Sequence, residues 1–88
     1  MPRLPVVSAT ELVKALGQQG YQVIRQKGSH MVVQKRIPTG TITTVVPNHK
    51  ELSPGTLRSI LKKTGISVDE LVRLLSVVVG VAVQFWPH

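Results

Sequence analysis

Apolar residues recur at helical spacing in the first segment of the 88-residue chain, at Ala9, Leu12, Val13 and Leu16. Ser8 and Glu11 stand three residues apart at the start of this segment, which is the arrangement of an N-terminal capping box. The pattern predicts an amphipathic helix over residues 8–19. Gly20 follows directly and is typical of a helix C-terminus.

Three strand-like runs follow the helix and are separated by short connections: residues 21–27, 30–36 and 41–46. The connections, residues 28–29 and 37–40, contain the glycine and proline that are typical of turns. Short connections between consecutive strands predict an antiparallel meander. Simple alternation in the first strand places Val23 on the same face as Arg25 and Lys27.

Two more helices are predicted after a polar loop. Ser53 is a cap residue followed by proline in the first turn, and Gly65 ends this helix. Ser67 and Glu70 form a second capping box, which opens a short helix. The predicted fold is therefore an α+β domain of two layers, with the helices on one face of a three-stranded antiparallel sheet. Double-stranded-RNA-binding domains share the order α-β-β-β-α, and this analogy supports only the fold.

The charge of the chain narrows the classes of partner. Eleven Lys and Arg residues face four Asp and Glu residues, giving a net charge of +7, which favours a polyanion, with nucleic acid ahead of a membrane. Cysteine is absent, which excludes disulfide and thiolate chemistry. Three histidines and four carboxylates are too few and too scattered for a convincing metal site, so no cofactor is predicted. Residues 1–5 lack the apolar run of a secretion signal, and we expect a cytoplasmic protein.

The turn Gly28-Ser29-His30 gathers the residues that are most suited to chemistry. It places an imidazole at a strand start, with a hydroxyl beside it and Lys27 close by. Glycine allows a positive φ and lets a bulky ligand approach the backbone. An ordinary imidazole titrates near pH ~6.5 and can therefore transfer protons in the cell. For this motif taken alone, the alternative is an ordinary surface histidine.

Several short motifs together resemble the HicA family of toxin–antitoxin systems, which are small ribonucleases of bacteria and archaea. The matching stretches are residues 1–6, the Gly-aromatic pair 20–21, the Gly-Ser-His stretch 25–30, the Val-Pro-x-His motif 46–49, and the blocks 54–61 and 65–67. The resemblance covers about residues 1–75. It implies a domain like the double-stranded-RNA-binding fold that cleaves messenger RNA and halts translation, and a HicB-type antitoxin that covers the active site.

On this resemblance the catalytic histidine of the family falls on His30, and the second histidine of the family falls on His49. Lys27 is expected to stabilise charge on the phosphorane, and Ser29 to donate a hydrogen bond to a phosphate oxygen. We expect RNA to contact Arg25, Lys27, Gly28, Ser29, Lys35 and His49. The alternative for His49 is a loop residue that hydrogen-bonds its own turn.

Residues 76–88 lie beyond the usual end of the family, so we expect a HicA-like domain over residues 1–75 and a C-terminal extension. The apolar run 77–86 is too short for a membrane-spanning helix, which needs ~20 apolar residues, and its valines favour a strand. Three interpretations are open: an extra edge strand that allows homo-oligomers, a contact for the antitoxin, or an adventitious extension.

Two other classes of protein fit parts of the chain. A non-catalytic RNA-binding module shares the charge and the fold. A helix-turn-helix DNA-binding protein fits the two predicted helices around Gly65. The second of these helices, however, carries Asp69, Glu70 and only Arg73, which is a poor surface for meeting phosphates in a major groove.

Overall fold

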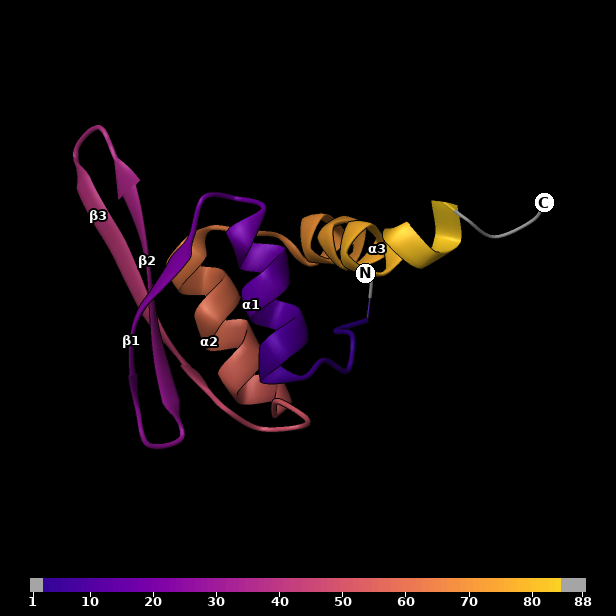
Figure 1. Ribbon diagram of the computed structural model, residues 1–88, viewed down its shortest axis with the longest axis horizontal. Coiled ribbons are helices and arrows are strands. Elements are labelled where there is room, and N and C mark those ends of the chain that lie inside the picture. Colours follow the sequence, from indigo (N-terminus) through magenta and orange to yellow (C-terminus); the bar gives the residue numbers. More distant parts are fainter. Residues whose placement is uncertain (1–2, 85–88) are drawn as a thin grey trace.

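The computed structural model describes residues 3–84, which form one antiparallel sheet and three helices (Figure 1). In chain order the elements are α1 (Ala9–Gly17), β1 (Gln22–Lys27), β2 (His30–Ile37), β3 (Gly40–Pro47), α2 (Pro54–Thr64) and α3 (Val68–Gln84). The strand order is β1-β2-β3, and α1 and α2 lie together on one face of the sheet. The predicted α+β fold, with a three-stranded antiparallel sheet, is confirmed.

The starts of α1 and α2 and the end of α2 form where the local sequence predicts them, whereas α1 ends at Gly17 with Gln18 as its C-cap and not at residue 19 as predicted. The Ser8 hydroxyl accepts from the Glu11 amide at 3.1 Å, and the Glu11 carboxylate accepts from the Ser8 amide at 2.9 Å, so both bonds of the capping box are present. Helix α2 begins with Ser53 as its cap and Pro54 as its first residue. It ends at Gly65, whose φ of 73° is readily adopted by glycine.

The hydrophobic core lies between the sheet and the pair α1 and α2, and continues between α1 and α3. Its largest fully buried side chains come from five elements: Leu12, Leu16, Leu57, Leu71, Val33 and Val46. Aliphatic side chains fill this core, in agreement with an aromatic content of only 3%. Because α1 contacts both the sheet and α3, it is the central helix of the fold.

A β-bulge in β1 changes the faces that simple alternation predicts. The pairing register shifts between Val23 and Arg25, so that Ile24 is an extra residue in the strand. Val23 lies opposite the buried Val33, whereas Arg25 lies opposite Val32. The prediction that Val23 shares a face with Arg25 and Lys27 is therefore wrong.

The bulge places two cationic residues on the face of the sheet that the helices leave uncovered. We call this the open face; on β2 it carries His30, Val32, Gln34 and Arg36, together with the residues opposite them on β1 and β3. Lys27 lies opposite His30, so both Lys27 and Arg25 belong to the open face. The one-residue shift in register thus places both cationic side chains of β1 on the open face.

The C-terminal segment differs from the prediction. Helix α3 continues to Gln84, whereas a short helix followed by a strand from residue 77 was expected, and that expectation is wrong. A valine costs less than about 1 kcal/mol relative to alanine when it extends a helix that is already nucleated, so the strand preference of valine is overridden. Residues 85–86 of the apolar run lie outside the described residues. No helix within residues 3–84 is long and apolar enough to span a membrane.

Replacing Tyr21 with phenylalanine should leave the protein equally stable or raise its free energy of unfolding by up to ~1 kcal/mol. The Tyr21 hydroxyl is buried and has no hydrogen-bond partner among the described residues, and burial raises the pKa of this phenol. The ring itself is retained, with the Lys35 ammonium 5.8 Å from its centroid. Urea denaturation of both proteins measures the difference. A loss of more than 1 kcal/mol would show that the hydroxyl has a stabilising partner.

Candidate functional site

His30 stands on the open face, at the end of the sheet formed by the β1–β2 turn. It is the first residue of β2, its side chain is exposed, and it lies opposite Lys27 on β1 and Pro47 on β3. Residues opposite each other in antiparallel strands have Cβ atoms about 4.5–5.5 Å apart, which puts the lysine stem directly beside the imidazole. Arg25 lies on the same face, opposite Val32. The sheet therefore brings an imidazole and two cations together.

The turn that precedes His30 is held by a backbone hydrogen bond from a distant segment. The Ser29 carbonyl accepts from the Asn48 amide at 2.6 Å, which joins the β1–β2 turn to the connection after β3. Gly28 has a φ of 57°, a conformation that costs other residues about 1–2 kcal/mol, and no atom lies within 4 Å of the position of a Cβ there. The turn is thus fixed in the backbone and open to solvent around its side chains.

His49 lies at the same end of the sheet as His30. Its amide donates to the Pro47 carbonyl at 2.8 Å and its carbonyl accepts from the Ala9 amide at 2.9 Å. These bonds hold the backbone, while the exposed imidazole has no hydrogen-bond partner among the described residues. The hydrogen bond within its own turn is therefore made by the backbone, and the imidazole is available to a ligand.

The surface around His30 carries positive charge, and the neighbouring sequence contributes no acidic residue. The segment from residue 12 to residue 50, which contains the whole sheet, has no aspartate or glutamate. Arg25, Lys27 and Arg36 all lie on the open face with exposed side chains. Arg36 belongs, with Arg25, Lys27 and Lys35, to the basic residues on or beside the first predicted hairpin. Its position on the open face follows from the alternation of β2 once the buried face is known.

Lys35 is the predicted site residue that the structure does not bring to His30. It lies opposite Ile42 on the helix-facing side of the sheet, and its ammonium is 5.8 Å from the centre of the Tyr21 ring. The side chain also runs past Gly20. Lys35 therefore stands five residues along β2 from His30 and on the opposite face, where it packs against the aromatic ring.

Potential metal ligands do not gather in the part of the chain that the structure describes. Within it, no group of three or more His, Asp or Glu residues has the spacing to hold a metal ion. The side chains available at the candidate site are instead an imidazole, a second imidazole nearby, a hydroxyl and several cations. This set suits proton transfer and phosphate binding.

Comparison with protein families identifies the chain. A family profile described as the HicA toxin of bacterial toxin–antitoxin systems matches residues 9–66, which run from the start of α1 to just beyond α2. The match covers more than half of the chain, and the protein belongs to the HicA toxin family. It is thus the toxin of a toxin–antitoxin pair, and an antitoxin is its implied partner. No curated protein and no solved structure matches the chain.

Proposed function

We propose that this HicA-family toxin is an endoribonuclease that cleaves messenger RNA, with His30 as a general acid or base. The observation that carries the proposal is the exposure of His30 on a basic face of the sheet, directly beside Lys27. An RNA strand can reach this imidazole without any movement of the helices, since they cover the other face. Arg25 and Arg36 supply affinity for the backbone of any RNA sequence.

RNA carries its own nucleophile, the 2′-hydroxyl next to each phosphate. Cleavage then requires a base for the 2′ proton, an acid for the departing 5′ oxygen, and positive charge near the phosphorane. His30 serves as one of the two proton carriers, for which a rate effect of about 10²–10⁴-fold is typical. The Lys27 ammonium stabilises the developing charge, and the Ser29 hydroxyl donates to a phosphate oxygen.

His49 is the proposed second proton carrier. Its imidazole is exposed at the same end of the sheet, and its backbone is anchored to Pro47 and to Ala9. A position held by the backbone leaves the ring free to approach the phosphate from the side opposite to Lys27. With two imidazoles, one takes the 2′ proton while the other protonates the leaving oxygen.

Cleavage by this route should leave a 2′,3′-cyclic phosphate on one fragment and a 5′-hydroxyl on the other, because the attacking oxygen belongs to the RNA itself. A single 2′-deoxy substitution at the cleaved linkage should abolish cutting there. Mass spectrometry of the fragments, together with end-labelling, measures both outcomes. Fragments with 3′-hydroxyl and 5′-phosphate ends, or unchanged cutting at the deoxy position, would refute the mechanism.

The partner is proposed to be a HicB-type antitoxin that covers the open face around His30. Ile24 lines a hollow together with the open-face residues Gln34 and Arg36. The open face thus combines cations with the partly apolar surface of Ile24 and Val45, which are 51% and 46% exposed. Such a mixed surface can bind a nucleic acid, and it can also bind a protein that blocks the nucleic acid from the site.

A non-catalytic RNA-binding module is the second candidate function. Against a stacking mode of binding, the open face carries no phenylalanine, tyrosine or tryptophan within the described strands, so it lacks the usual stacking platform for single-stranded bases. Binding of RNA without any cleavage by the purified toxin would favour this candidate.

A further inference from the structure

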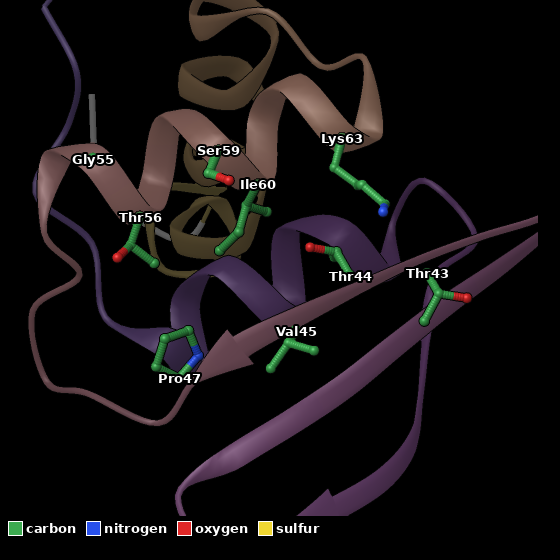
Figure 2. A pocket seen from close by; sticks show the side chains of 9 residues that line it. All are labelled: Thr43, Thr44, Val45, Pro47, Gly55, Thr56, Ser59, Ile60 and Lys63. Carbon is green, nitrogen blue, oxygen red and sulfur yellow. The ribbon is translucent and has the colours of Figure 1, made fainter.

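A groove runs between the edge strand β3 and helix α2, outside the site around His30 (Figure 2). It has a volume of about 530 Å³ and is open to solvent. We propose that this groove binds a phosphate of the RNA backbone that flanks the cleaved linkage, with Thr44, Ser59 and Lys63 as its ligands. The inference rests on the proposed function and names a subsite for the same substrate.

Thr44 is the first reason to assign a ligand to the groove. It is 8% exposed and, apart from Tyr21, it is the only residue with a polar side-chain group among the buried residues of the described chain. Its hydroxyl forms no side-chain hydrogen bond with any residue in the described range. In Figure 2 the side chain points from β3 toward α2, whereas Thr43 and Val45 point to the other face. The hydroxyl therefore remains free to donate into the groove, where a phosphate oxygen would accept its hydrogen bond.

Helix α2 presents donors to the groove along one face. Thr56, Ser59 and Lys63 all line it, and their spacing of three and four residues places them on the same side of the helix. The Lys63 side chain extends from the helix toward β3, as Figure 2 shows. No aspartate or glutamate lines the groove, so no carboxylate competes there for its hydroxyl and ammonium donors. Donors without acidic partners are the pattern that binds an oxyanion.

One end of the groove lies next to the strand that carries His30. Pro47 lines one end of the groove and lies opposite His30 on the neighbouring strand. Adjacent strands are about 4.8 Å apart, so a strand of RNA that passes over His30 reaches the groove by crossing the edge of the sheet at β3. The subsite therefore fixes the direction in which the RNA leaves the catalytic residues.

The adjacent residue Lys62 offers a matched control. It belongs to the same helix and is also exposed, but it lines a separate groove together with Arg3 and Arg58. Substitution of either lysine removes the same charge from α2. A difference between the two variants therefore reports the position of the ammonium and not the net charge of the protein.

The experiment measures the affinity for a messenger RNA fragment in the His30→Ala background, with Lys63→Ala or Lys62→Ala added, over a range of salt concentrations. Lys63→Ala should weaken binding on the order of tenfold and should lower the slope of log K against log salt by about 0.7. Lys62→Ala should change the affinity less than about twofold. Equal effects of the two substitutions, or the absence of RNA binding by every variant, would overturn the assignment.

Thr44→Val separates a role in binding from a role in folding. The change removes the hydroxyl and keeps the shape, so the variant should bind RNA more weakly while its Tm equals or exceeds that of the parent. A lower Tm, or unchanged binding, would contradict the proposal. A protein that binds RNA with this dependence on Lys63 but never cuts it would refute the proposed catalysis and leave the subsite intact.

Inorganic phosphate distinguishes an RNA subsite from a site for the free anion. In an NMR titration of the full chain, millimolar phosphate should shift the amide signals of Thr44 and Ser59, and RNA should displace it. Shifts caused by phosphate in a protein whose RNA affinity is independent of Lys63 would identify a free-anion site and overturn the RNA assignment. Pairing of β3 with a peptide strand, the other use of this edge, would leave these signals insensitive to phosphate.

Discussion

Replacing His30 with alanine should lower the rate of messenger RNA cleavage by about 10²–10⁴-fold, while RNA binding changes little. The imidazole is exposed at the start of β2, so its loss removes a proton carrier and no part of the core. Arg25 and Lys27, the cations proposed to hold the RNA backbone, remain in place on the same face. Single-turnover cleavage at saturating protein, with RNA affinity measured in parallel, separates the two effects.

Arg36→Ala is the matched control for His30→Ala. Arg36 is exposed on the same face of the same strand, but it stands six residues further along β2. Its loss should weaken RNA binding and reduce the salt dependence, with the single-turnover rate unchanged at saturation. A folded His30→Ala protein that cleaves at the parental rate would remove His30 from the mechanism.

Leu71→Ala should lower the free energy of unfolding by about 2–5 kcal/mol, which is a large part of the stability of a domain of this size. Leu71 is completely buried, on the part of α3 that packs against α1. The Gln18 side chain of the segment after α1 also donates to the Leu74 carbonyl at 3.2 Å. Although the family match ends at residue 66, the folded core thus includes the first turns of α3.

Val72→Ala is the control, since Val72 is the next residue of α3 and is 43% exposed. Val72→Ala should lower the free energy of unfolding by less than about 1 kcal/mol. The loss of partly buried apolar surface is partly offset by the better helix propensity of alanine. Urea denaturation followed by circular dichroism measures both variants. If Leu71→Ala were as stable as Val72→Ala, α3 would contribute nothing to the folded domain.

The starts of α1 and α2 could be predicted because their causes are local. A capping box needs only Ser8 and Glu11, and the start of α2 needs only Ser53 and Pro54, all within a few residues of each other. The bulge at Ile24 depends instead on the partner strand, whose register decides where the extra residue is placed. The end of α3 depends on a competition between helix extension and strand preference, which the valine content alone does not decide.

Some residues of the candidate site could be predicted from the local sequence, and others depend on the packing of distant segments. Lys27, Gly28, Ser29 and His30 are contiguous, so the motif that predicts them also places them together. Lys35 is close in sequence, but strand alternation places it on the other face, where its ammonium lies near the Tyr21 ring. The β3–α2 groove could not be predicted, because Thr44 and Lys63 meet only through the packing of α2 on the sheet.

The most direct measurement incubates the purified toxin, free of antitoxin, with a long messenger RNA in excess EDTA. We predict that the RNA is cut into discrete fragments, since the proposed chemistry uses the hydroxyl of the RNA and the side chains around His30. RNA that is bound by the toxin and stays full-length in this assay would contradict the assignment of ribonuclease activity.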